Sequence, residues 1–316
     1  MKKFSGKRFL AIIFSVALTL LGVAGMTACG GEKDITVVVR DQGSGTREAF
    51  DTVVTDGNGN YLQMKISGKT YFYATSKADV QKETGNVLTK VASDINAIGY
   101  VSFGSINDSV KVVSVNGVSP SKETVLDKTY PIQRPFVIMT SSTVALNDVT
   151  KDFLSYLKSN SSNFSAQTAG CIFLEDPLMR SSDGTTAVPV TEYVVKEELP
   201  AGGKIIINGS TSMEKFIKKS MSTYASLYGK TADELFTLDL QGSSFGKEAV
   251  KGDKNGNVIG LSSAAVSENG IDSFKVCLDA VAVIVNSRNE IVSDLTIEQL
   301  YSVFTGRTTK FSQLAG

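Results

Sequence analysis

Residues 35–47 read ITVVVRDQGSGTR and residues 205–212 read IIINGSTS, and these two stretches decide the fold. Each is an apolar run that predicts a buried strand, and each ends in a turn of glycine, serine and threonine. A helix-like stretch follows both turns, so unpaired backbone N–H groups collect where the helix begins. Such groups attract anions. Two turns of this kind facing one another predict a site for a small tetrahedral oxyanion.

The remainder of the chain repeats the alternation of strand and helix. Strands are expected at residues 98–103, 110–115, 136–139, 238–240, 258–261 and 280–285. Helices are expected at residues 47–54, 85–93, 149–157, 213–228 and 296–304, with further helix starts after Ser243-Ser244 and Ser262-Ser263. Residues 159–186 are rich in Ser, Thr, Asn and Gly and are interpreted mostly as loop. This order predicts an α/β protein with largely parallel sheets.

Composition removes several classes of function. Basic and acidic residues number 32 each, so no excess charge points to nucleic acid. Histidine is absent, which excludes a Ser-His-Asp triad, a Cys-His pair and any histidine-ligated metal. We expect no metal, no cofactor and no enzymatic activity, although a serine–lysine pair stays open as an alternative.

The N-terminus has the pattern of a targeting segment. A basic start, with Lys2 and Arg8, precedes an apolar stretch at residues 9–21 that is short for a membrane span. Small residues then precede Cys29, as at a bacterial lipoprotein cleavage site. We expect residues 1–28 to be a signal peptide and a lipid on Cys29 to hold the mature chain at the outer face of the cell membrane. The alternative is an ordinary secretory signal with an incidental cysteine.

Two cysteines remain in the mature chain, Cys171 and Cys277. An oxidising compartment would permit a disulfide between them. We prefer the interpretation that both are small buried hydrophobic residues, because the sequence gives no indication that their Cα atoms lie within bridging distance.

The small hydroxyl residues have a simpler explanation as well. Serine and threonine commonly cap helices, so the first turn could be structural, with Thr46 as N-cap and Arg40 in a surface ion pair. An arginine four positions before a Ser-Gly-Thr turn nevertheless offers a rigid fork that matches two oxygens of an anion. Four hydroxyl-bearing turns at expected helix starts exceed what capping usually needs.

Several segments resemble the phosphate-binding proteins of bacterial phosphate ABC importers. Residues 35–50, 93–101 and 130–136 are similar to the second half of that family, and residues 208–212, 241–244, 278–286 and 295–306 are similar to its first half. The resemblance omits residues 159–203. It implies a two-lobed fold of the periplasmic-binding-protein type (type II), with two crossover strands near residues 131–139 and 281–286.

The two halves stand in the opposite order to the family's usual one. A circular permutation accounts for this order, and residues 159–203 would then link the old ends. A truncated tandem duplication is the competing explanation. The resemblance implies one lobe from residues 29–130 plus 286–316, which carries the Arg-x-x-x-Ser-Gly-Thr turn. Residues 131–285 would form the other lobe, which carries the Gly-Ser-Thr-Ser turn.

Matching the family's motifs residue by residue implies a set of phosphate ligands. One lobe would supply Arg40, Ser44, Gly45 and Thr46, and the other Thr211, Ser212, Ser243 and Ser263. Many family members have an aspartate at the position of Ser263, where it accepts the proton of hydrogen phosphate. Serine can also donate, so selectivity against sulfate stays open.

The resemblance therefore implies an extracytoplasmic, lipid-anchored monomer. It would bind inorganic phosphate between its lobes and deliver it to the permease and ATPase complex of an ABC importer. One alternative keeps the fold but binds sulfate or molybdate. Another is a phosphate sensor or surface adhesin that takes no part in transport.

Overall fold

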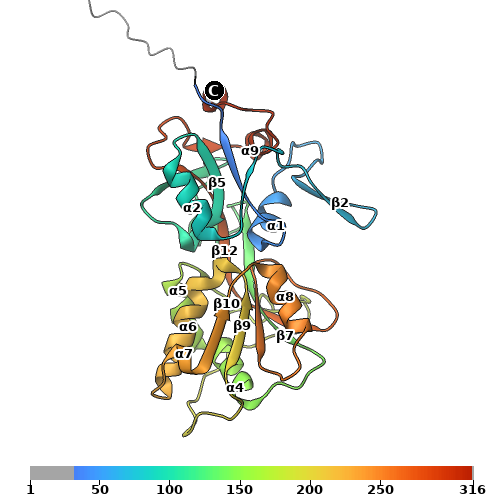
Figure 1. Cartoon of the computed structure of the whole chain (residues 1–316), viewed down its shortest axis with the longest axis vertical. Helices are drawn as coiled ribbons and strands as arrows, with labels where there is room; N and C mark the ends of the chain where they lie inside the picture. The colour runs from blue at the N-terminus through green and yellow to red at the C-terminus, as the bar shows by residue number, and fades with distance from the viewer. Residues whose placement is uncertain (1–31, 315–316) are drawn as a thin grey trace, which may run out of the picture. The chain divides into compact units, whose positions relative to one another are not determined.

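The computed structural model describes residues 32–314, and every helix and strand lies in the compact unit Asp34–Gly316 (Figure 1). The strands are β1 (Thr36–Arg40), β2 (Gln63–Ile66), β3 (Lys69–Phe72), β4 (Asp79–Gln81), β5 (Ala97–Ser102), β6 (Val110–Val115), β7 (Gln133–Ser141), β8 (Ile172–Phe173), β9 (Ile205–Gly209), β10 (Phe236–Asp239), β11 (Val258–Ser262), β12 (Ile271–Asn286) and β13 (Asp294–Leu295). The α-helices are α1 (Gly45–Asp51), α2 (Thr84–Ser93), α3 (Lys122–Leu126), α4 (Asp148–Lys158), α5 (Asn163–Thr168), α6 (Glu214–Leu227), α7 (Ala232–Leu235), α8 (Ser243–Lys251) and α9 (Ile297–Phe304).

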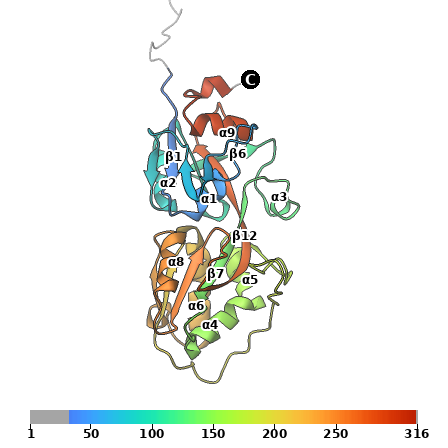
Figure 2. The ribbon, with the colours of Figure 1, turned by 90° about the vertical axis from the view of Figure 1, so that its right-hand side faces the viewer.

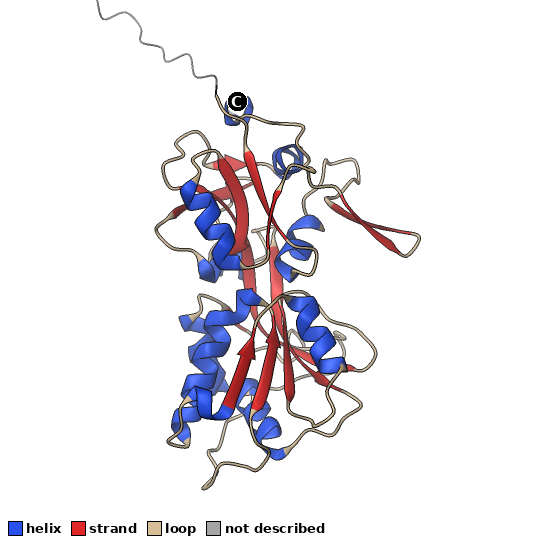
Figure 3. Ribbon diagram, viewed as in Figure 1, coloured by secondary structure: helices blue, strands red, loops and turns tan. Residues whose placement is uncertain are grey.

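One mixed sheet of 11 strands organises the unit, with the order β10-β9-β11-β7-β12-β5-β1-β4 and β6, β8 and β13 attached beside this path. β1 pairs in parallel with β4 and β5, and β9 pairs in parallel with β10 and β11. β7 and β12 run antiparallel to their neighbours. The expectation of largely parallel sheets is therefore wrong at the centre, where these two strands reverse the direction. Helices flank the strands on both sides (Figure 3).

Two large hydrophobic cores and two smaller clusters lie along this sheet. The first core includes Val37, Phe50, Tyr100 and Phe304, and α1 and α9 pack against the sheet there. Phe50 stacks on Tyr100 with ring centroids 4.1 Å apart. The buried aromatic rings explain why the short helix α1 is held in place, since a seven-residue helix is marginal by itself.

The second core includes Phe153, Ile207, Phe216 and Phe236, contributed by α4, β9, α6 and β10. β12 takes part in both cores, through Cys277 in the second and Val281 in the first. β7 pairs with β12 from Gln133 to Ser141. These two long strands therefore connect the regions around the two cores, as Figure 2 shows for β7 and β12. The sequence resemblance places Val281 in the lobe of residues 131–285. In the structure it packs in the first core, together with residues of β1.

Residues 159–186 contain a helix and a strand, α5 and β8, where mostly loop was expected. The turn after β11 also differs, because no helix follows Ser262-Ser263. The Ser262 hydroxyl accepts from the backbone N of Ala264 at 3.2 Å and donates to its carbonyl at 2.9 Å. These two bonds close a local turn, so the chain does not start a helix there.

Candidate functional site

The first glycine turn ends β1 and begins α1. Ser44 is the N-cap of α1, and its hydroxyl oxygen accepts from the backbone N of Thr46 at 3.2 Å and of Arg47 at 3.4 Å. The alternative in which Thr46 caps the helix is therefore wrong. Because Ser44 performs that role, the Thr46 side chain is available for contacts outside its own helix.

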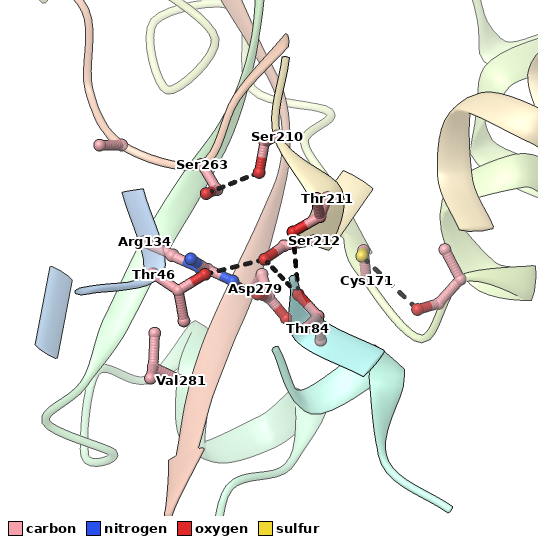
Figure 4. A network of polar contacts seen from close by, with 12 residues as sticks. Thr46, Thr84, Arg134, Cys171, Ser210, Thr211, Ser212, Ser263, Asp279 and Val281 are labelled. Atoms are coloured by element: carbon pink, nitrogen blue, oxygen red, sulfur yellow. Dashed lines mark hydrogen bonds and ion pairs between the residues drawn. The ribbon is translucent and has the colours of Figure 1, made fainter. Parts of the chain in front are cut away.

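Thr46 contacts the second glycine turn directly. Its Oγ1 lies 2.8 Å from Oγ of Ser212, a residue 166 positions away along the chain (Figure 4). Thr84, at the start of α2, places its Oγ1 3.1 Å from Oγ1 of Thr211 and 3.5 Å from Oγ of Ser212. All four side chains are buried. Hydroxyls from three helix starts thus meet at one place in the fold.

The other two predicted serines lie together beside Gly45. Ser243 Oγ accepts from the backbone N of Ser263 at 3.1 Å, and Ser210 Oγ donates to Ser263 Oγ at 2.9 Å. A Cβ added to Gly45 would stand 2.6 Å from Ser243 Oγ and 2.7 Å from Ser263 Oγ. Glycine is therefore required at position 45, because any side chain would push the two turns apart.

Arg40 is buried and not part of a surface ion pair. Its Nη1 donates to Thr84 Oγ1 at 3.2 Å, and its Nε and Nη2 donate to the carbonyls of Gln81 at 3.2 Å and Lys82 at 2.6 Å. Burial lowers the pKa of Arg40, and Asp41, with a carboxylate oxygen 3.7 Å away, opposes that change. Arg40 therefore contacts the buried hydroxyls of the second turn only through Thr84. No pattern in the sequence indicates that Thr84 belongs to the site.

A second buried arginine lies in the same region of the fold (Figure 4). Arg134 on β7 donates through Nε and Nη2 to Oδ2 of Asp279 on β12, at 3.0 and 2.8 Å. Arg134 Nη1 is buried without a hydrogen-bond partner. Burial raises the pKa of Asp279 and Arg134 opposes the increase. Arg134 also lowers the pKa of Arg40 electrostatically, so the two guanidinium groups are close enough to repel one another.

The sequence contains a weak signal for this pair. Asp279 is the one charged residue in the apolar run from Val276 to Val285, and a buried charge of that kind needs a partner. Ser210 and Thr84 have no comparable signal, since each is a single hydroxyl residue with an ordinary capping explanation.

A cavity of about 800 Å³ lies beside the buried hydroxyls of the second turn and α2. Thr84 and Thr211 form part of its wall, together with the charged residues Glu83, Lys204, Glu214, Lys218 and Asp233. Thr46, Ser212, Ser243 and Ser263 are not in that wall. The cavity therefore reaches one edge of the site rather than its centre.

The remaining predictions on individual residues have different outcomes. Cys171 and Cys277 are buried free thiols, which confirms the preferred interpretation. A hydrogen bond with Cys277, together with burial, raises the pKa of Cys171. Cys29 lies outside the described residues. Within residues 32–314 no helix combines the length and apolar character needed to cross a membrane.

Comparison with known proteins identifies a family and several relatives that this chain resembles. The family model described as "PBP superfamily domain" matches residues 27–161 and 194–316. The phosphate-binding protein PstS 2 of Streptococcus pneumoniae is 32% identical over 95% of this chain and 99% of its own length. PstS 2 of Streptococcus agalactiae is 30% identical over 94% of this chain and 95% of its own. A crystal structure of a phosphate ABC transporter phosphate-binding protein from S. pneumoniae is 30% identical, with a TM-score of 0.63 over 89% of this chain and 99% of that one.

The order of segments is shared with these relatives. Both PstS 2 proteins align with this chain almost from end to end, so the arrangement is not peculiar to it. The family model omits residues 162–193, inside the stretch 159–203 that the sequence resemblance also left out. The circular permutation relative to other members of the family stays a prediction.

Proposed function

Since the chain belongs to the periplasmic-binding-protein (PBP) superfamily, we propose that it binds inorganic phosphate and delivers it to an ABC importer. The relatives that it matches over nearly their full length are phosphate-binding proteins by name. The observation that carries the proposal is the 2.8 Å contact between the hydroxyl groups of Thr46 and Ser212. It joins the two turns that the sequence resemblance implies as the ligand site.

The chemistry of the cluster suits a dehydrated tetrahedral anion. Thr46, Thr211, Ser212, Ser243 and Ser263 supply hydroxyl groups that can rotate to donate to anion oxygens. The Ser44-Gly45-Thr46 turn adds backbone at close approach, since Gly45 carries no side chain. A bound phosphate would separate Thr46 from Ser212 slightly and accept a hydrogen bond from each.

Two guanidinium groups would balance the negative charge. Arg40 is held against Thr84, and we include it in the site as the sequence resemblance implies. We add Arg134, because its Nη1 is a buried donor without a partner and buried donors are normally satisfied. Each guanidinium group has a carboxylate nearby, Asp279 for Arg134 and Asp41 for Arg40, so the free donor that the pair offers an anion is Nη1 of Arg134.

We propose that the two cores correspond to two lobes that move about β7 and β12. Residues 29–130 plus 286–316 would form one lobe and residues 131–285 the other. The separation of the first core from the second supports two lobes, and the packing of Val281 in the first core puts that end of β12 with the first lobe. Binding between the lobes would favour the closed arrangement, in the manner of hinge closure.

We propose no catalytic role. The sequence lacks histidine, and among residues 32–314 none of the site serines is hydrogen-bonded to a lysine that could serve as a base. We also propose that Cys29 carries a lipid and that the mature monomer works outside the cytoplasm. Transport relatives support that location, and the lipoprotein-like sequence around Cys29 supports the anchor.

One observation favours a second ligand. Ser263 accepts a hydrogen bond from Ser210 and keeps its own proton to donate, so it would not repel an anion that has no proton. Sulfate is therefore the competing ligand. Isothermal titration calorimetry with phosphate in the presence and absence of excess sulfate, at pH 6 and pH 8, distinguishes the two. Phosphate binding that sulfate leaves unchanged supports the proposal, and tighter binding of sulfate contradicts it.

A further inference from the structure

Among the strands of the described residues, β2 and β3 alone do not belong to the large sheet and form a separate hairpin. It pairs from Gln63↔Phe72 to Ile66↔Lys69 around the turn Ser67-Gly68. Both turn residues have positive φ, 50° and 80°, as a tight two-residue hairpin requires. Figures 1 and 3 show the hairpin projecting from the region around α1.

The two faces of this hairpin differ in what they contact. Directly paired residues share a face, so Gln63, Lys65, Thr70 and Phe72 lie on one side. On that side Phe72 packs under the guanidinium of Arg47, 4.8 Å from its ring centroid, which attaches the hairpin to α1. The hairpin is thus fixed to the body by one face.

The other face is exposed and mostly apolar, with Lys69 beside Ile66 at the turn. It presents Met64, Ile66, Tyr71 and Tyr73, and the last three are each more than two-fifths exposed. Tyr61, at the base, is also exposed. A two-stranded hairpin in water normally buries such a face, because it is barely stable alone. A contiguous group of exposed apolar side chains indicates a surface that another molecule or a membrane covers.

The charged residues in and beside the hairpin indicate what kind of partner would cover this face. Lys65, Lys69 and Lys77 are exposed, and between Gly57 and Ala78 the sequence has no acidic residue. Within the described part of the chain none of these lysines forms an ion pair. Tyrosines beside lysines are the composition of segments that lie at a membrane surface, where the rings sit at headgroup level and the ammonium groups meet anionic lipid.

We propose that the β2–β3 hairpin rests on the anionic surface of the bilayer through Ile66, Tyr71 and Tyr73. Lys69, which shares that face, would meet lipid phosphates, and Lys65 and Lys77 would add positive charge nearby. The proposal rests on the lipid anchor of the proposed function. Even fully extended, the segment from Cys29 to Ile35 spans at most about 20 Å, so a lipid on Cys29 keeps the start of β1 near the membrane. Weak hairpin contacts then form at high effective concentration.

The absence of tryptophan from the sequence makes a direct test possible. Tyr71→Trp places a single fluorescent reporter on the exposed face. Val194→Trp, at a side chain 75% exposed among acidic neighbours, is the matched control. Each full chain is produced in a bacterium that acylates lipoproteins and is reconstituted into vesicles of phosphatidylcholine alone or with phosphatidylglycerol. Flotation with neutral vesicles reports the anchor separately from the hairpin.

We expect the emission of the Tyr71→Trp chain to shift to shorter wavelength in the anionic vesicles and to lose most of its intensity to brominated lipid. The Val194→Trp chain keeps the emission of a water-exposed ring. Adding Lys65→Glu, Lys69→Glu and Lys77→Glu abolishes the shift but not flotation. The same charge change at Lys122, Lys128 and Lys254 leaves the shift intact.

Other outcomes overturn the proposal. An unshifted Tyr71→Trp emission in a chain that floats would mean that the hairpin does not touch lipid although the anchor is present. A shift that needs vesicles containing the importer would assign the face to a protein partner. A shift without vesicles that grows with protein concentration would assign it to a second copy. Failure to float on neutral vesicles would refute the anchor, and with it the basis of this inference.

Discussion

The hydroxyl oxygens of Thr46 and Ser212 lie 2.8 Å apart, although one begins the helix after β1 and the other follows β9. Both side chains are buried. This contact brings the two glycine turns together, and the sequence could predict only that each turn exists. It also defines which substitutions should weaken anion binding without disturbing the fold.

Thr46→Val removes the hydroxyl at nearly constant volume. We expect phosphate to bind more weakly by about 1.5–3 kcal/mol, roughly 10- to 150-fold, because a hydrogen bond to a charged group is lost. Thr52→Val at the C-cap of α1 is the control, since the exposed Thr52 hydroxyl bonds only to the carbonyl of Glu48. Calorimetry should give a native dissociation constant for the control. Equal affinities for the two variants would remove Thr46 from the site.

Gly45→Ala adds a Cβ where Ser243 and Ser263 leave no room. We expect the two turns to separate, with a cost of about 1–3 kcal/mol from overpacking and a weaker affinity for phosphate. Gly85→Ala is the control, because its added Cβ meets nothing within 4 Å. Urea unfolding and calorimetry should affect only the first variant. A native affinity for Gly45→Ala would show that the turns do not meet when ligand binds.

The Arg134–Asp279 pair separates a structural role from a binding role. Arg134→Met alone strands a buried carboxylate and should destabilise the protein by about 3–5 kcal/mol. Combining it with Asp279→Leu replaces both charges with apolar groups and should restore most of the stability. If Arg134 Nη1 contacts the anion, the stable double variant still binds phosphate much more weakly. Native affinity in the double variant would restrict Arg134 to a structural role.

Asp51 should give the protein a dependence of stability on pH. Burial raises its pKa from 3.8 to about 6, although Arg47, 2.9 Å away, opposes the increase. Because the folded state holds the proton more tightly, this contribution is complete below pH 4 and is lost as the pH rises through about 6. The change amounts to roughly 3 kcal/mol.

Urea unfolding between pH 4 and pH 7 measures this effect as a difference between the native chain and Asp51→Asn. We expect the native free energy of unfolding to fall relative to that of the variant across this range. Parallel curves for the two proteins would mean that Asp51 ionises near its ordinary pKa in the folded state.

Local pattern predicts most of the fold. The apolar runs place β1, β6 and β11 within one or two residues, because buried strands are continuous in hydrophobicity. β12 is less visible, since only its end at Ala280–Val285 is uniformly apolar, while Asp272, Ser273 and Lys275 alternate with buried residues. α5 has a sequence of weak helix propensity and depends on tertiary packing.

The candidate site was likewise predictable only in part. Glycine turns identify Ser44, Gly45, Thr46 and Ser212, because backbone geometry there demands specific residues. The Arg134–Asp279 pair joins residues 145 positions apart. The apolar run around Asp279 indicates that this carboxylate needs a partner, but no local pattern identifies Arg134 as that partner. The helix expected after Ser263 fails for a local reason, the closed turn that Ser262 makes with Ala264.

A crystal structure of the protein grown with phosphate tests the central claim most directly. The account predicts one anion between the two turns, with oxygens at about 2.7–3.2 Å from both Thr46 Oγ1 and Ser212 Oγ. The Thr46–Ser212 hydrogen bond would be replaced by two bonds to that anion. Phosphate bound elsewhere, with the two hydroxyls still in contact with each other, would contradict it.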